Sequence, residues 1–234
     1  MPPRPPVLLL TGANGFIGRR LLSGLSGPWA VVSASRTANG PDTAVLDLAE
    51  PASIARVFDA VRPDVVVHAG AVADPDTAER DPAHARKVNV DATRALARLC
   101  GGARSRLVFL STDLVFDGAG SWYDEDAAPR PLSVYGKGKL EAEEAALTLC
   151  PGAVALRVSS CYGRPLGGRT CFVDHLQASL SAGKPIDGFT DQWRTSTNAD
   201  QLPEVIRRIL ADPDLEGVFH WGGADRASRY ETAV

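Results

Sequence analysis

Long hydrophobic runs are missing from this 234-residue sequence, and so is a marked excess of charge of one sign. The first apolar run spans residues 7–10, far short of the roughly 20 residues that cross a bilayer, and leads straight into a glycine turn. The 25 Lys and Arg residues nearly balance the 28 Asp and Glu residues, without a basic stripe. We therefore expect a cytoplasmic protein with neither membrane nor nucleic-acid partners.

Cysteine and histidine are also scarce, with four residues of each type. The cysteines form no C-x-x-C pair, the histidines are scattered, and the four thiols lie at Cys100, Cys150, Cys161 and Cys171. This pattern lacks the ligand spacing of a zinc site and predicts reduced, partly buried thiols. We expect no bound metal.

The sequence does contain a regular alternation of apolar runs and amphipathic segments. Predicted strands lie at residues 7–11, 29–35, 44–48, 64–70, 106–112 and 153–159. Predicted helices lie at residues 16–25, near 54–61, at about 82–100 and at 133–149. Strands separated by helices are typical of a parallel sheet covered on both faces. The predicted fold class is therefore α/β, a Rossmann-type doubly wound sheet.

The same pattern divides the chain into three parts. Residues 1–6 are proline-rich and predict a flexible leader, and residues 7–160 hold the dinucleotide-binding Rossmann domain. Residues 161–234 predict a small, loosely organised substrate-side region with segments that return to the core. Its predicted elements are helices at about 172–182 and 199–211 and a strand at 217–221. Ligands of doubly wound sheets lie beyond the carboxyl ends of the strands, where this region is expected.

A glycine-rich turn follows the first predicted strand. Gly12, Gly15 and Gly18 form G-x-x-G-x-x-G between a strand and a helix. The first glycine allows the tight turn, the second lets the backbone approach a pyrophosphate, and the third lets the helix pack close to the sheet. The helix N-terminus offers unpaired N–H groups to the phosphates. Glycines alone can simply be turns, but the strand–turn–helix context predicts a dinucleotide site.

The end of the second strand bears on which nicotinamide cofactor is bound. An acidic residue there would bind the ribose 2′-hydroxyl of NAD, but the sequence reads Ser-Ala-Ser-Arg and ends at Arg36. Arg36 suits the 2′-phosphate of NADP, and the alternative is an ordinary surface arginine. NADPH is favoured and NAD stays an option. Asp47 could accept a hydrogen bond from the adenine amino group, or it could be a helix-cap or loop aspartate.

A second constellation lies at the start of the helix expected at 133–149. Tyr135 and Lys139 are four residues apart and so share one helical face. A nearby ammonium lowers the pKa of a phenol, and such a tyrosine can protonate a carbonyl oxygen. Ser111 and Thr112 end the fifth strand, where a hydroxyl could fix the same oxygen. Y-x-x-x-K alone would indicate an exposed helix with a lysine that extends to solvent. Catalysis is favoured because the motif follows, in order, the glycine turn and the Ser/Thr pair at a strand end within one βαβ series.

Taken together, the sequence resembles the extended short-chain dehydrogenase/reductase family, and within it the dTDP-4-dehydrorhamnose reductase family. The segments that carry the resemblance are TGANGFIG (11–18), RPDVVVHAGAVADPDTAERDP (62–82), VNVDAT (88–93), FLSTDLVFDG (109–118), YDEDAAPRPLSVYGKGKLEAE (123–143) and DQWRTST (191–197). The resemblance covers nearly the whole chain.

The resemblance implies a role for each group of residues. Its catalytic residues are Thr112, Tyr135 and Lys139, and Lys139 would also hold the nicotinamide ribose. Residues 68–71 would pass beneath the adenosine and its ribose. The full cofactor set predicted here is Gly12, Asn14, Gly15, Phe16, Ile17, Gly18, Arg36, Asp47, Leu48, His68, Ala69, Gly70, Tyr135 and Lys139.

The substrate side is implied with less detail. Segments that border the substrate in this family include Asp74, Asp113, Phe116 and Arg157. A nucleotide-sugar pyrophosphate would need cations, and those available are Arg157, Arg164, Arg169 and Arg194. The sequence departs from the family twice: Gly138 replaces a usual serine, and the sequence ends several tens of residues before family members do. We expect part of the substrate-side region to be missing.

Three functions are compatible with these features. The leading one is NADPH-dependent reduction of a nucleotide-linked 4-keto-6-deoxysugar. A second is a dinucleotide-binding, non-catalytic protein that resembles the regulatory subunit of methionine adenosyltransferase. A third is an epimerase or dehydratase with tightly held NAD, which Leu114 disfavours because an acidic residue is usual at that position. The resemblance also implies a homodimer as one assembly state.

Overall fold

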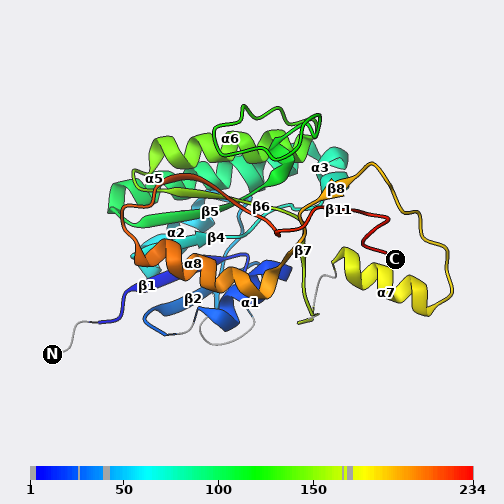
Figure 1. Ribbon diagram of the computed structural model, residues 1–234. Coiled ribbons are helices and arrows are strands. Elements are labelled where there is room, and N and C mark those ends of the chain that lie inside the picture. Colours follow the sequence, from blue (N-terminus) through cyan, green and yellow to red (C-terminus); the bar gives the residue numbers. More distant parts are fainter. Residues whose placement is uncertain (1–3, 26, 39–42, 165, 168–170, 234) are drawn as a thin grey trace.

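A parallel sheet runs through the centre of the molecule (Figure 1). The computed structural model describes residues 4–25, 27–38, 43–164, 166–167 and 171–233. The strands of the sheet are β1 (Val7–Thr11), β2 (Ala30–Ser35), β3 (Thr43–Val45), β4 (Val65–His68), β5 (Arg106–Thr112), β6 (Val154–Val158) and β10 (Gly217–Trp221). They are all parallel, in the order β10-β6-β5-β4-β1-β2-β3. The predicted Rossmann-type α/β fold is confirmed.

Helices cover both faces of the sheet. One face carries α1 (Phe16–Gly24) and α8 (Leu202–Ala211), and the other carries α2 (Pro51–Val61), α5 (Ala92–Ala103) and α6 (Val134–Leu149) (Figure 1). Successive strand residues point to opposite faces. Leu8 and Leu10 therefore pack with Leu21 of α1, whereas Leu9 packs with Leu96 of α5. Because both faces are apolar, the strands read as continuous hydrophobic runs.

The segment after β4 differs from its prediction. The structure contains an unpredicted short helix, α3 (Pro75–Arg80), and divides the expected helix at 82–100 into α4 (Pro82–Arg86), a π-helical turn (Lys87–Asp91) and α5. Asp74 and Asp81 each precede a proline, and each carboxylate accepts a hydrogen bond from the N–H three residues later. An N-cap followed by proline is a helix-start signal, so the repeated Asp-Pro accounts for the two short helices.

The region after residue 160 is built from small pieces. They are β7 (Cys161–Tyr162), α7 (Phe172–Ser181), β8 (Trp193–Arg194), β9 (Thr197–Asn198) and β11 (Ala227–Ser228). The two-residue strands pair as β7 with β9 and as β8 with β11, away from the main sheet. Between these pieces the chain supplies α8 and β10 to the core. Two-residue strands are too short to show a period of two, so the sequence did not predict them.

The structure shows the state of the few cysteines and the character of the helices. All four cysteines are free thiols, and three of them are buried. Within the described ranges, no helix is both long enough and apolar enough to cross a membrane.

Candidate active site

The turn between β1 and α1 depends on the absence of side chains. Gly12 has a φ of +71°, and a Cβ built on it would lie 2.6 Å from Cα of Gly70, the residue two positions beyond β4. A Cβ on Gly18 would lie 2.0 Å from the carbonyl oxygen of Gly12. Gly15 is the N-cap of α1 and has no side chain to occupy the N–H groups of the first turn. This backbone cradle fits a dinucleotide pyrophosphate.

Side chains around the turn fix it to the end of β2. Nδ2 of Asn14 donates to Oγ of Ser35 at 2.8 Å and to Oγ1 of Thr37 at 3.2 Å. Arg36 lies between these two acceptors, is exposed, and forms an ion pair with none of the described carboxylates. The ring of Phe16 lies 3.8 Å beneath the guanidinium of the buried Arg20.

The remaining residues predicted for the adenosine side lie near this turn or on its border. Ile17 is half-buried and packs against the core of the α1 face. Leu48 places Cδ1 2.5 Å from the position of a Cβ on Gly70. The Asp47 carboxylate accepts a hydrogen bond from the N–H of Ala49 at 2.9 Å, as a loop aspartate does.

The His68 side chain points into the core. Nδ1 lies 2.6 Å from Oγ1 of Thr11, and Nε2 lies 3.1 Å from Oγ1 of Thr93 on α5. Burial, and secondarily the charge of Lys139, lowers the pKa of His68 to about 3. The imidazole is therefore neutral near pH 7, and both of its ring nitrogens are occupied by hydroxyl groups inside the fold.

The predicted catalytic tyrosine lies beside the end of β5. Tyr135 is in the first turn of α6, and its side chain forms a hydrogen bond with that of Thr112. Burial raises the pKa of Tyr135 to about 12, the Asp113 charge adds to the rise, and the bond to Thr112 opposes it. The spacing of Tyr135 and Lys139 predicts a lowered pKa, and the structure differs because desolvation outweighs every contact that favours the phenolate.

Lys139 lies one turn further along α6 and is almost fully buried. Nζ donates to the carbonyl oxygen of Leu110 and lies 3.9 Å from the centre of the Phe109 ring. Burial lowers the pKa of Lys139 to about 7, and the charge of Glu143 partly opposes this. The amine can therefore hold or release a proton near neutral pH.

Glu143 is a buried residue that was not among the predicted site residues. It accepts three hydrogen bonds from Arg157, two from Nε and the shortest from Nη2 at 2.8 Å, and another from Oγ of Ser111. Ser111 is thus directed toward α6, which leaves Thr112 as the hydroxyl beside Tyr135. The spacing of Glu143, four residues after Lys139, is the signal by which it could have been found.

The same cluster holds two of the predicted substrate residues. Arg157 is only 5% exposed, and its guanidinium lies 5.2 Å from the centre of the Phe116 ring. Phe116 stacks on Tyr123 at 4.3 Å between ring centres and meets His220 edge-on. These contacts fasten the long loop after β5 to the end of β10. Asp74, by contrast, caps α3.

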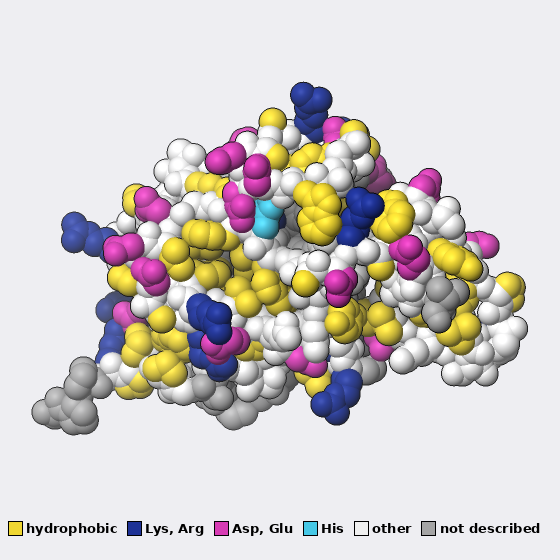
Figure 2. Space-filling view, in the orientation of Figure 1, with side chains coloured by type: hydrophobic (Ala, Val, Ile, Leu, Met, Phe, Trp, Pro, Cys, Tyr) yellow, Lys and Arg dark blue, Asp and Glu magenta, His cyan; other side chains and the backbone are white. Residues whose placement is uncertain are grey.

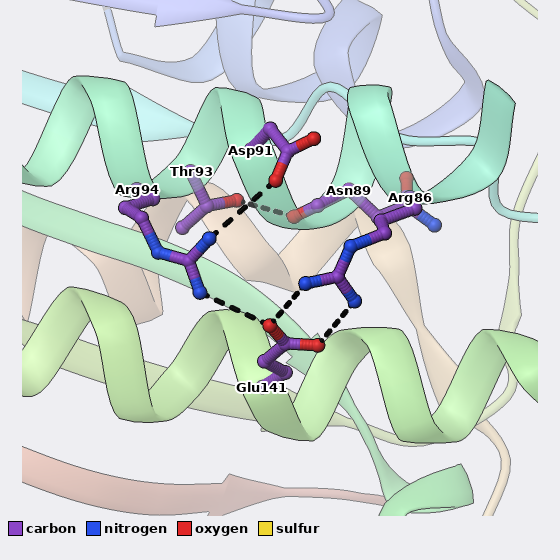
Figure 3. A network of polar contacts seen from close by, with 6 residues as sticks. All are labelled: Arg86, Asn89, Asp91, Thr93, Arg94 and Glu141. Atoms are coloured by element: carbon purple, nitrogen blue, oxygen red, sulfur yellow. Dashed lines mark hydrogen bonds and ion pairs between the residues drawn. The ribbon is translucent and has the colours of Figure 1, made fainter. Parts of the chain in front are cut away.

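A polar network outside the cluster keeps α6 in place (Figure 3). Glu141 on α6 accepts from both terminal nitrogens of Arg86 at 2.7 Å and from Arg94 at 3.0 Å. Arg94 in turn approaches Asp91 at 3.5 Å. The bonds to Arg86 are the largest cause of the lowered pKa of Glu141. The network joins α6, which carries Tyr135, to α4 and α5.

Cationic side chains gather on the substrate side. Nη1 of Arg194 donates to the carbonyl oxygen of Trp193, and Arg226 lies 4.4 Å from the centre of the Trp193 ring. Figure 2 shows such a Lys or Arg side chain between hydrophobic side chains over β8 and β11. Burial lowers the pKa of Arg229, the nearby Arg194 lowers it further, and Asp113 opposes both. Arg229 was not among the predicted residues.

Comparison with known proteins gives this architecture a family. The sequence profile of the RmlD substrate binding domain matches residues 7–234.

The chain belongs to the RmlD substrate-binding-domain family.

Relatives of this RmlD-family chain have two kinds of names. A probable dTDP-4,6-dihydroxy-2-methyloxan-3-one 4-ketoreductase of Streptomyces antibioticus is 36% identical, over 96% of this chain and 74% of that protein. Methionine adenosyltransferase 2 subunit beta of Danio rerio is 34% identical, over 96% of this chain and 71% of that protein. Sequence similarity alone therefore does not separate a reductase from a subunit of another enzyme.

Solved structures agree on the fold of the RmlD-family chain. A Bacillus anthracis dTDP-4-dehydrorhamnose reductase in complex with NADP superposes with a TM-score of 0.89, 26% identity, and coverage of 98% of this chain and 79% of that chain. A hypothetical dTDP-4-dehydrorhamnose reductase from Sulfolobus tokodaii gives a TM-score of 0.87, 30% identity, and coverage of 97% and 79%.

Proposed function

We propose that this protein is an NADPH-dependent reductase of a nucleotide-linked 4-keto-6-deoxysugar. The observation that carries the proposal is the grouping of Thr112, Tyr135 and Lys139 at the carboxyl end of β5. The glycine turn follows β1 of the same parallel sheet, so it lies at the same edge. Ligands of doubly wound sheets lie at that edge. The reductase names of the Streptomyces and Bacillus relatives support the same substrate class.

The protonation states suit a reduction. Bound NADPH would supply the hydride. Tyr135, with a pKa of about 12, keeps its proton at neutral pH and can donate it to the oxygen of the carbonyl that is reduced. Thr112 shares a hydrogen bond with this phenol and can orient the same oxygen. Lys139 lies on the tyrosine's own helical face, where its cationic form would stabilise the phenolate that remains.

The preference for NADPH rests on the end of β2. The residues there are Ser33, Ala34, Ser35 and Arg36, so the acidic side chain that binds the ribose 2′-hydroxyl of NAD is lacking. Arg36 is exposed next to the Asn14–Thr37 contact, where it can reach a 2′-phosphate. The complex of the Bacillus relative with NADP supports this choice.

The diphosphate of the nucleotide sugar would be bound by Arg194 and Arg229. The charge of Arg194 lowers the pKa of Arg229, so the two cations interact electrostatically, and Arg229 also interacts with the charge of Asp113. Two like charges held close together favour an anion between them. Arg157, predicted from the sequence to contact substrate, is instead paired with Glu143. It would support Phe116, whose ring its guanidinium contacts, rather than bind the diphosphate itself.

A second candidate function is favoured by the methionine adenosyltransferase relatives. Subunit beta of Xenopus tropicalis is 32% identical over 95% of this chain and 69% of that protein. On this hypothesis the chain binds dinucleotide and assembles with another protein without turnover. The epimerase alternative has less support, since the epimerase structures are at most 24% identical and show the fold alone.

One assay separates the two candidates. NADPH oxidation is followed with a freshly prepared dTDP-4-keto-6-deoxysugar, using the wild type and Tyr135→Phe. We expect turnover by the wild type, a loss of at least about 1,000-fold in the variant, and unchanged NADPH affinity in both. NADPH binding without turnover by the wild type would instead favour the binding-subunit function. Equal activity of the two proteins would show that Tyr135 is not the proton donor.

A further inference from the structure

A chain of hydroxyl groups leads from the C-terminal region to the catalytic end of β5. Oγ1 of Thr195, between β8 and β9, donates to Oγ of Ser159 at 3.2 Å. Oγ of Ser159 donates to Oδ2 of Asp113 at 3.0 Å. The other carboxylate oxygen, Oδ1, lies 3.4 Å from Oγ1 of Thr112. This series of hydrogen bonds therefore ends at Thr112, the residue that is hydrogen-bonded to Tyr135.

The backbone holds Ser159 independently of its side chain. Thr112 pairs with Val158 in the β5–β6 register, so the residues that follow each strand, Asp113 and Ser159, lie side by side. The N–H of Ser159 donates to the carbonyl oxygen of Trp221 at the end of β10, at 3.1 Å. With the backbone fixed in this way, the Ser159 hydroxyl has a defined direction toward the carboxylate.

Thr195 is placed with similar precision. Its carbonyl oxygen accepts from the N–H of Gly223 at 2.8 Å. A Cβ on Gly222 would lie 2.6 Å from Oγ1 of Thr195, so the hydroxyl occupies space that glycine leaves open. Threonine and serine hydroxyls commonly bond to nearby backbone. Here the two hydroxyls instead bond to each other and to a carboxylate 46 residues before Ser159.

The weakest contact of the chain is the one nearest the chemistry. At 3.4 Å, the approach of Thr112 to Asp113 depends on where the carboxylate is held. Ser159 is the side chain that fixes the opposite oxygen, and Thr195 fixes Ser159. Hydrogen bonds in series polarise one another, so removing the outer one weakens the inner one.

We infer that Ser159 and Thr195 are positioning residues, which hold the Asp113 carboxylate and through it Thr112, so that turnover depends on the seating of the C-terminal region. This inference rests on the reductase function proposed above. It assigns a role in the reaction to a segment that contains neither the proton donor nor the glycine turn.

The test uses steady-state kinetics on Thr195→Val, Thr195→Ser, Ser159→Ala and the Ser159→Ala/Thr195→Val double variant. We expect kcat to fall about tenfold for Ser159→Ala and about fivefold for Thr195→Val, with the KM for NADPH unchanged. Thr195→Ser should recover kcat, because it restores the hydroxyl. The double variant should be no slower than Ser159→Ala, because Thr195 acts only through Ser159. The matched control is Ser196→Ala, which removes the half-buried hydroxyl next to Thr195 in the sequence.

Each failure has a distinct signature. A wild type without turnover on any 4-keto sugar nucleotide removes the proposed function and this inference with it. A wild type that turns over while Thr195→Val matches it overturns the inference alone. So does a double variant whose loss is the product of the single losses. Equal losses in Thr195→Val and Thr195→Ser, with lower melting temperatures, would show a merely structural role.

Discussion

The cofactor side and the substrate side of the proposed site are built from different parts of the polypeptide. Around the glycine turn, the proposed contacts to the cofactor come from the backbone, and Gly12 and Gly18 leave no room for a further carbon atom. On the substrate side, the groups are the side chains of Ser159, Thr195 and Arg229, set around two-residue strands. The first side should therefore fail when an atom is added, and the second when a functional group is removed.

Between the two sides, the largest effect on ligand binding is expected from an added methyl group at the glycine turn. In Gly12→Ala, the Cβ would have to fit at a φ of +71° and 2.6 Å from the Gly70 backbone. Strain of this kind costs about 3 kcal/mol, so we expect NADPH affinity to fall at least about 100-fold. Isothermal titration calorimetry on protein shown to be folded measures this loss. Wild-type affinity would mean that the turn does not hold the pyrophosphate.

Gly102→Ala is the matched control. A Cβ at Gly102 meets nothing within 4 Å, and the residue lies inside α5 with an ordinary helical backbone. Replacing glycine by alanine in a helix stabilises by up to about 1 kcal/mol. The control should therefore bind NADPH normally and melt at the same or a higher temperature.

The cofactor side should also be the acid-sensitive part of the molecule. The pKa of His68 is about 3 in the fold against 6.5 in a model peptide, so the unfolded chain binds the extra proton between these values. Stability from this residue is complete above pH 6.5 and is lost as the pH falls toward 3. Between pH 7 and pH 5 the loss should be about 2 kcal/mol.

Urea unfolding at several pH values measures this dependence. His68→Gln should flatten it, because the glutamine does not titrate. His84→Gln is the control, since His84 is exposed on α4 and should leave the slope unchanged. A wild-type slope in His68→Gln would show that other groups control acid unfolding.

The same contrast explains which parts could be predicted from the sequence. The strands and the glycine turn are local patterns, and the facing of Tyr135 and Lys139 follows from helical spacing alone. Thr195 and Ser159 are 36 residues apart, and only the packed fold brings them together. The direction of the Tyr135 pKa also depends on burial, which a spacing argument does not contain.

Two other misses had signals in the sequence. The repeated Asp-Pro at Asp74 and Asp81 predicts the starts of α3 and α4. The four-residue spacing of Lys139 and Glu143 predicts that both lie on one face of α6. By contrast, the π-helical turn at Lys87–Asp91 interrupts an otherwise continuous helical pattern, and nothing in the residue types marks it. Helix starts and shared helical faces can therefore be predicted from local sequence, whereas polar pairs that form between distant segments cannot.

A smaller effect is expected when charge is removed from the substrate side. Arg229→Gln should raise the KM for the sugar nucleotide about tenfold, because one of two cations facing the diphosphate is lost. The NADPH affinity should stay unchanged. Arg226→Gln is the control, since Arg226 is exposed and stacks on Trp193. Equal effects of the two substitutions would indicate a general electrostatic attraction rather than a binding pair, and added salt would then abolish both.

The smallest effect tests Arg36, an exposed side-chain charge on the proposed cofactor side. Arg36→Glu should weaken NADPH binding about fivefold and NADH binding less than twofold, because only NADPH carries the 2′-phosphate. The modest size follows from the exposure of Arg36, where water and salt screen the contact. Arg98→Glu makes the same change of charge at an exposed position on α5 and should alter neither affinity. Equal losses for NADPH and NADH would show that Arg36 does not contact the phosphate, and cofactor choice would then rest on the backbone, as the rest of that side does.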